Sequence, residues 1–178
     1  FWWEWGHRLL GRVVGLVWAA GFIFFLATKR IPPGWTGRLL VLGALGGLQG
    51  FAGWWMVSSG LEGEMTSVAS YRLAVHLGLA FLIVGLIAWD VLLLSRTEPE
   101  LLRARRAGEP RLARGTGHVL GLLGLQLLLG ALVAGIDAGR GYTDWPFMAG
   151  GFFPPGMWDY TPWWRNFFEN DGTVQFIH

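Results

Sequence analysis

Residues 73–94 read LAVHLGLAFLIVGLIAWDVLLL, an apolar run whose only ionisable members are His76 and Asp90. A helix needs about 20 predominantly apolar residues to cross a lipid bilayer, so this run is long enough to span one. The chain has three further runs of this kind, at residues 9–28, 39–57 and 117–136. Four such runs in one chain indicate an all-α, polytopic transmembrane helix bundle.

The composition agrees with a membrane protein and excludes several other classes. Of the 178 residues, 53% are hydrophobic and 15% are charged, and there is no cysteine. This balance excludes a disordered chain, a collagen-like chain, a zinc finger and a disulfide-stapled domain. The basic residues behind the net charge of +2 lie mainly in short loops between the apolar runs. We therefore do not expect nucleic acid as a partner.

We expect residues 1–178 to form a single transmembrane domain. The chain does not begin with Met and stops at His178 inside what reads as a motif, so we expect a fragment of a longer protein. The expected elements are four complete helices, an outer aromatic loop and the start of a truncated fifth helix, at residues 7–28, 39–58, 71–95, 116–137, 138–172 and from 173 onward.

The charges of the loops predict the orientation in the membrane. The 29–38 loop holds three basic residues and no acidic one, and the 96–115 loop holds six basic and three acidic residues. The 58–71 turn and the 137–172 segment are net acidic. Since basic loops stay inside, the first two loops are predicted inside and the last two outside, together with the N-terminus. The aromatic residues of the outer segment suit either an interfacial belt or a lid over an apolar ligand.

This topology predicts that three of the four histidines lie at one membrane level. His7, His76 and His178 fall at the outer ends of their helices, whereas His118 falls at an inner end. Ionisable groups at membrane depth are costly and often functional. Two imidazoles at matched depth on separate helices suit axial ligation of a haem iron. The alternative is that each histidine is merely interfacial.

An acid and several arginines share the outer level. Glu4 precedes His7 by one helical turn and suits either an acid–base group or a simple ion pair with Arg8 at i+4. Arg8, Arg12 and Arg72 could meet haem propionates, although snorkelling to lipid headgroups is a simpler account of each. Asp90 is expected to pair with an arginine of an inner loop and is assigned no chemistry.

Two apolar runs carry the same short pattern. Leu48-Gln49 is followed by Gly53, and Leu125-Gln126 is followed by Gly130. A glutamine on an apolar helix is expected to make an interhelical hydrogen bond in preference to a ligand contact.

Several stretches resemble the haem A synthase (Cox15/CtaA) family. EWGHRLLGR at 4–12 resembles its Glu-x-x-His-Arg-Leu-x-Gly-Arg signature, and YRLAVHL at 71–77 resembles its Tyr-Arg-Leu-Ala-x-His-Leu motif. Residues 48–61, 130–139 and 163–178 resemble further family motifs, in the same order. The resemblance covers nearly the whole chain and is closest to the alphaproteobacterial and mitochondrial form.

The resemblance implies an eight-helix fold of two pseudo-symmetric halves, of which this chain spans the second helix to the start of the sixth. It implies oxidation of the C8 methyl of haem O to a formyl group, by successive hydroxylations with oxygen from water, in the assembly of cytochrome c oxidase. It implies His7 and His76 as the histidine pair of the N-terminal half, His178 as one ligand of haem b, and Glu4 as the acidic residue of the reaction.

The resemblance also implies partners and a location. Haem O is the substrate, haem O synthase is its expected donor, and the lipid bilayer surrounds the bundle; a homo-oligomer is compatible with the family. The expected location is the bacterial inner membrane, with the haem sites toward the periplasm, in preference to the mitochondrial inner membrane. Where the family often has an aspartate, this chain has Ala149, which puts a role for that carboxylate in doubt; Asp144 lies nearby.

Two other functions remain open on the residues alone. One is a cytochrome b-like electron carrier with two bis-His haems and no chemistry on the macrocycle. The other is a haem-free transporter or assembly protein with interfacial histidines.

Overall fold

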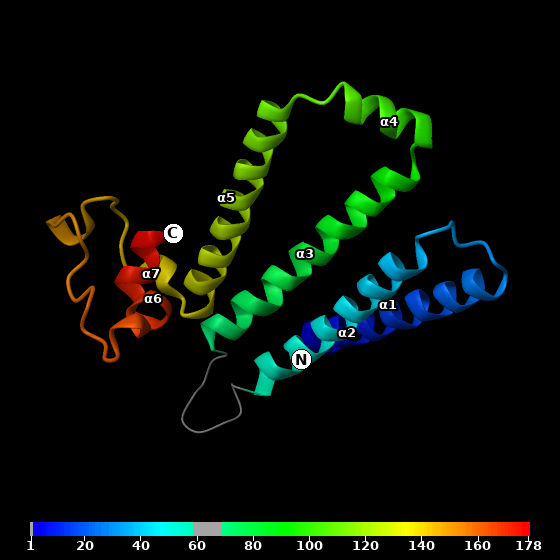
Figure 1. The fold of residues 1–178 in the computed structure, drawn as a ribbon. Helices are drawn as coiled ribbons and strands as arrows, with labels where there is room; N and C mark the ends of the chain where they lie inside the picture. Colours follow the sequence, from blue (N-terminus) through cyan, green and yellow to red (C-terminus); the bar gives the residue numbers. More distant parts are fainter. Residues whose placement is uncertain (1, 59–68) are drawn as a thin grey trace.

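The computed structural model describes residues 2–58 and 69–178, and within these ranges every regular element is helical (Figure 1). The predicted all-α fold is confirmed. Residues 59–68, which include Glu62 and Glu64 of the expected acidic turn, lie outside the described residues. The elements in chain order are α1 (Trp2–Ala27), α2 (Thr36–Ser58), α3 (Ser70–Leu94), α4 (Glu98–Arg106), α5 (Pro110–Gly135), the short 3-10 helices η2 (Ala138–Arg140), η3 (Met148–Gly150) and η4 (Trp163–Arg165), then α6 (Asn166–Glu169) and α7 (Asp171–Ile177).

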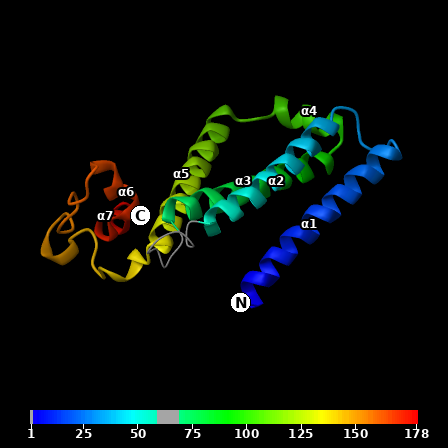
Figure 2. The same cartoon turned by 90° about the horizontal axis from the view of Figure 1, so that it is seen from below.

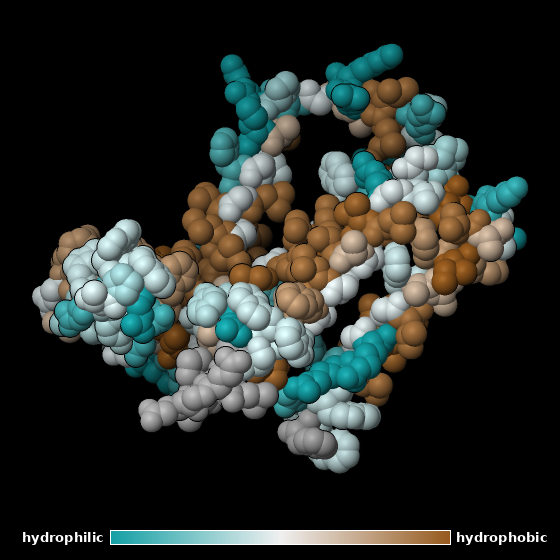
Figure 3. Space-filling model, turned by 60° about the horizontal axis from the view of Figure 1, so that its bottom comes forward, coloured by the Kyte–Doolittle hydropathy of each residue, from teal (hydrophilic) through white to brown (hydrophobic). Residues whose placement is uncertain are grey.

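Among the described residues, α1, α2, α3 and α5 are each long and apolar enough to cross a membrane. Most of their large apolar side chains are exposed, and Figure 3 shows hydrophobic atoms along the lengths of the helices. In water such a surface would drive aggregation, whereas in a bilayer it faces lipid or neighbouring helices. The chain therefore has the form of a multi-pass membrane protein.

The helix bounds differ from the expected ones mainly at the N-terminal ends. α1 begins at Trp2 and α5 at Pro110, five and six residues before the expected starts. Pro110 occupies the first turn of α5, where a missing backbone N–H costs nothing because that group has no helical partner.

The inner hydrophilic segment contains a helix, α4, that the hydropathy pattern did not indicate. Its first turn is a capping box, in which the Thr97 backbone N–H and hydroxyl both donate to Glu100 Oε2 at 2.8 Å. These hydrogen bonds lower the pKa of Glu100, because they stabilise its carboxylate.

The long helices pack as consecutive neighbours. α2 contacts both α1 and α3 (Figures 1 and 2). α3 and α5 converge where α3 begins and α5 ends, and separate toward α4 (Figure 1). At the close end, a Cβ added to Gly135 would lie 2.7 Å from Ser70 Cα, so glycine permits this approach of two backbones. The buried residues Ala74, Ala131 and Val174 join α3, α5 and α7 in one apolar cluster.

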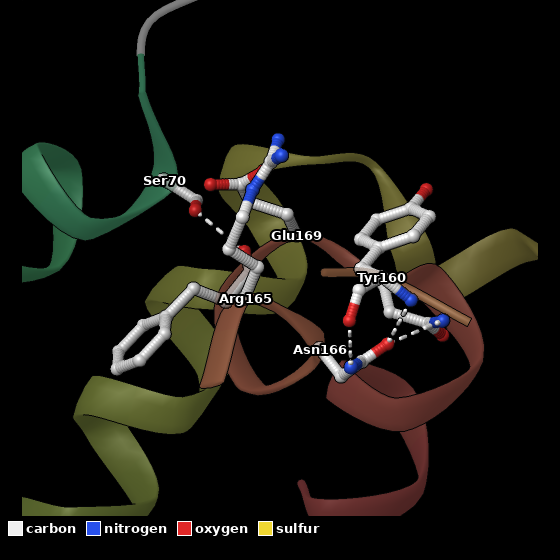
Figure 4. A network of polar contacts seen from close by, with 7 residues as sticks. Ser70, Tyr160, Arg165, Asn166 and Glu169 are labelled. Carbon is white, nitrogen blue, oxygen red and sulfur yellow. Dashed lines mark hydrogen bonds and ion pairs between the residues drawn. The ribbon is translucent and has the colours of Figure 1, made fainter. Parts of the chain in front are cut away.

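The outer segment between α5 and α7 is folded around a polar core. The fully buried Asn166 accepts a hydrogen bond from the Tyr160 N–H and donates to the carbonyls of Tyr160 and Trp163 (Figure 4). The Ser70 hydroxyl donates to the Phe168 carbonyl at 2.8 Å and ties this unit to α3. Several aromatic side chains of the segment are exposed, among them Trp145, Phe147, Phe152, Phe153, Trp158 and Trp163.

Candidate functional site

His76 lies in the second turn of α3 and packs directly against α2. Gln49 Nε2 donates to the His76 carbonyl at 3.1 Å and also lies 3.4 Å from His76 Nε2. One turn further along α2, a Cβ added to Gly53 would lie only 2.9 Å from His76 Cε1. The imidazole therefore fills the space in which any other residue at position 53 would place its Cβ.

His76 retains unused hydrogen-bonding capacity within the part of the chain that the structure describes. Its Nδ1 is buried without a hydrogen-bond partner there, and so is Gln49 Oε1. Buried polar atoms are normally paired, and an unpaired one requires an explanation such as an unfilled role. An imidazole held by its backbone, with a ring nitrogen that has no hydrogen-bond partner, is a group that can bind a metal ion.

His7 lies in the second turn of α1, as His76 lies in the second turn of α3. It is exposed, and α1 and α3 both pack against α2. Among the described residues, no group of three or more His, Asp or Glu side chains could hold a metal ion. A pair of imidazoles is one ligand set that suits axial ligation of a haem iron.

His178, an exposed residue directly after α7, makes two comparable contacts with α5. Gln126 Nε2 donates to the His178 carbonyl at 2.8 Å. A Cβ added to Gly130 would lie 3.0 Å from His178 Nε2. His118, the fourth histidine, is exposed about two turns before Gln126 on α5.

Two cavities border His178. One, of about 450 Å³, lies between α3 and α5 and is lined mostly by apolar side chains, including Leu73, Leu77 and Leu127. The other, of about 510 Å³, lies toward the outer segment and includes Asp144 in its wall. The first has the apolar lining that a porphyrin or an isoprenoid chain requires.

The predicted acid and arginines make local contacts. Glu4 forms an ion pair with Arg8 one turn later, as the simpler interpretation of Glu4 predicted. Arg72 donates to the Trp55 carbonyl at 2.8 Å and lies over the Trp55 ring at 4.8 Å. Its guanidinium thus stabilises the last turn of α2, while its Nε is buried without a partner among the described residues. Arg12 is exposed on α1.

Two further expectations are confirmed. Both glutamines make interhelical hydrogen bonds. Asp90 pairs with Arg38, with Arg38 Nη1 2.8 Å from Asp90 Oδ1. Sequence reasoning missed the two glycines that make room for the imidazoles, although their shared position, one turn after a glutamine, was the available signal.

Ala149 has a left-handed backbone, with φ of 53°. Asparagine and aspartate adopt this conformation more readily than alanine does. An aspartate at this position would therefore have a backbone reason to be there, independent of any proton chemistry.

The fold and these contacts define a multi-pass helical membrane protein that presents imidazoles at the contacts between its helices. Over residues 1–178 the chain matches the model of the COX15-CtaA family, described as cytochrome oxidase assembly protein, and the chain belongs to this family.

Several curated relatives are similar over the full length of the chain. It is 70% identical to the heme A synthase of Paracoccus denitrificans, 67% identical to that of Dinoroseobacter shibae and 66% identical to that of a Jannaschia species. The chain spans about half the length of these relatives, 47%, 46% and 47% respectively. No solved structure matches it.

Proposed function

We propose that the protein to which this chain belongs is a haem A synthase, an oxidoreductase that converts haem O to haem A. In the proposed reaction the C8 methyl of haem O becomes a formyl group, by successive hydroxylations with oxygen from water. This oxidation releases four protons and four electrons per methyl group, and the electrons pass to an external electron acceptor. The observation that carries the proposal is similarity, over the whole of this chain, to three proteins of this name. In this chain the His76 ring packs against Gly53, and its Nδ1 has no hydrogen-bond partner among the described residues.

In this proposal His7 and His76 hold the substrate haem O, and His178 is one ligand of a haem b cofactor. The matching positions of His7 and His76, each in the second turn of its helix, support the first assignment, and the apolar cavity beside His178 supports the second. The bound haem supplies the redox chemistry. The protein's part is to orient the imidazoles and to keep the macrocycle in an apolar setting, where burial of its hydrocarbon surface favours binding.

Glu4 is proposed to accept protons released as the methyl group is oxidised. It lies on α1 one turn from His7, and its side chain is 61% exposed, so a proton taken up there can pass to water. The ion pair with Arg8 orients the carboxylate. Arg8, Arg12 and Arg72 are proposed to meet the propionates.

The proposed location is a bacterial inner membrane, with the histidines toward the periplasm. The basic 29–38 and 96–115 segments support this orientation. Haem O synthase is the proposed donor of the substrate.

The test compares single variants of the full-length protein, produced in cells that supply haem O. Glu4→Gln should retain bound haem and lose haem A, because the amide cannot accept a proton. His7→Ala and His76→Ala should lose haem or change its absorption spectrum. The matched control is His118→Ala, which removes an exposed histidine of α5 and should change neither reading. Full haem A production by Glu4→Gln would refute its catalytic role, and unchanged haem in both histidine variants would refute ligation.

A further inference from the structure

Two glutamine–glycine pairs hold two histidines in the same way. Gln49 and Gly53 lie one turn apart on α2, and Gln126 and Gly130 lie one turn apart on α5. Residues four apart share one face of a helix. Each pair therefore places a side-chain amide donor and a residue without a side chain on the same face of its helix.

Each element of a pair acts on a different part of the histidine. The amides of Gln49 and Gln126 donate to the backbone carbonyls of His76 and His178, at 3.1 Å and 2.8 Å. This contact fixes how the histidine-bearing helix is rotated and shifted against its neighbour. The glycine then admits the imidazole, since a Cβ would lie 2.9 Å from the His76 ring or 3.0 Å from the His178 ring.

Only some glycines of these two helices are in close contact. Gly46, Gly47 and Gly50 also lie on α2, yet a Cβ added to any of them would meet nothing within 4 Å. On α5, Gly121 and Gly124 are equally open. A Cβ at Gly43 would meet Trp18 and one at Gly135 would meet Ser70, so Gly53 and Gly130 are the glycines of α2 and α5 at which an added Cβ would meet a histidine.

We infer that Gln49 with Gly53, and Gln126 with Gly130, are positioning residues that set the imidazoles of His76 and His178 for haem ligation. The inference that these histidines bind haem rests on the proposed function. The inference that the two glutamine–glycine pairs position the histidines does not. Each pair acts on its own histidine, so its loss should disturb one haem site and leave the other intact.

The first experiment measures haem binding by the full-length protein. Gly53→Ala and Gln49→Leu should weaken binding at the His76 site by roughly 10-fold or more, the usual loss when a group that orients a ligand is removed, and should shift its absorption spectrum. Gly130→Ala and Gln126→Leu should do the same at the His178 site. Gly50→Ala and Gly124→Ala are the matched controls on the same helices and should change neither site.

A further control separates positioning from general stability. Arg38→Met breaks the Arg38–Asp90 ion pair between α2 and α3. It should lower the stability of the protein without changing the spectrum of either haem. Gln49→Glu is a second variant of nearly the same shape; its carboxylate cannot donate to the carbonyl, so it should behave like Gln49→Leu even if the leucine variant fails to fold.

The second experiment needs no haem. The protein is prepared haem-free and treated with diethyl pyrocarbonate, and modification of His76 is followed by mass spectrometry. Gly53→Ala and Gln49→Glu should increase the rate several-fold, because they release a ring that is now partly buried, whereas Gly50→Ala should not.

The two experiments distinguish failure of the inference from failure of the proposed function. Unchanged His76 reactivity in Gly53→Ala and Gln49→Glu would overturn the inference, whatever the haem content. Increased reactivity in a protein that binds no haem would support the inference that Gln49 and Gly53 position His76, and would refute the proposed ligation of haem.

Discussion

Replacing Arg38 by methionine should destabilise the protein much more than replacing Asp90 by asparagine. The two side chains form an ion pair between α2 and α3, with Arg38 Nη1 2.8 Å from Asp90 Oδ1. They are unequally buried, because the Asp90 side chain is 13% exposed and the Arg38 side chain is 49% exposed. Each replacement therefore leaves a different partner behind.

The magnitudes follow from this inequality. Arg38→Met leaves a nearly buried carboxylate without its cation, and breaking a buried pair in this way costs about 3–5 kcal/mol. Since solvent already screens the half-exposed arginine, we expect about 2–3 kcal/mol. Asp90→Asn leaves an arginine that can extend into water or among headgroups, so we expect about 1 kcal/mol or less.

The assay is a double-mutant cycle on unfolding of the full-length protein in detergent, with Arg38→Met/Asp90→Asn as the double variant. The double variant should be more stable than Arg38→Met alone, because it removes the stranded charge. A coupling of about 1 kcal/mol or more is expected for two residues in direct contact. Equal costs for the two single variants, or strictly additive effects, would refute the reasoning.

Three further predictions concern packing and the outer segment. Gly135→Ala should cost about 1–3 kcal/mol in thermal unfolding, because the new Cβ meets the backbone of Ser70; Gly124→Ala, in open space, should cost nothing, and equal melting of the two variants would contradict this. Asn166→Ala strands the hydrogen-bonding groups around it at a cost of about 1–3 kcal/mol, so limited proteolysis should cut the outer segment faster; an unchanged cleavage rate would count against its polar core. Ala149→Gly should raise the melting temperature, since relief of a left-handed alanine is worth about 1 kcal/mol; a lower melting temperature would argue against strain at this residue.

The long helices could be predicted from sequence because a bilayer imposes length and apolarity directly on the chain. The short helix α4 was not predicted, because it is hydrophilic and only nine residues long. Its signal was the Thr97–Glu100 capping box, which depends on local hydrogen bonds and not on hydropathy.

The candidate site was predictable only in part. Asp90 required a basic partner because an unpaired charge in an apolar helix is costly, but the choice of Arg38 depends on how α2 and α3 align. The pattern shared with Gln126 and Gly130 distinguishes Gly53 from Gly46 and Gly50 in the sequence. Only the packing of α3 on one face of α2 shows that Gly53 makes room for a histidine.

The outer segment shows a similar limit. Its aromatic residues are evident in the sequence, and several of them are exposed in the structure. Its buried polar residues, Asn166, Asn170 and Thr173, are not evident, because an irregular loop has no periodicity that separates inside from outside.

The most direct test of the account is to identify the haems bound to the full-length protein. It would be produced in cells that supply haem O, purified in detergent, and its haems extracted and identified by chromatography and mass spectrometry. The account predicts haem B together with haem A or a hydroxylated haem O. Haem B alone would contradict the synthase activity and indicate an electron carrier, and no haem at all would contradict ligation by the histidines.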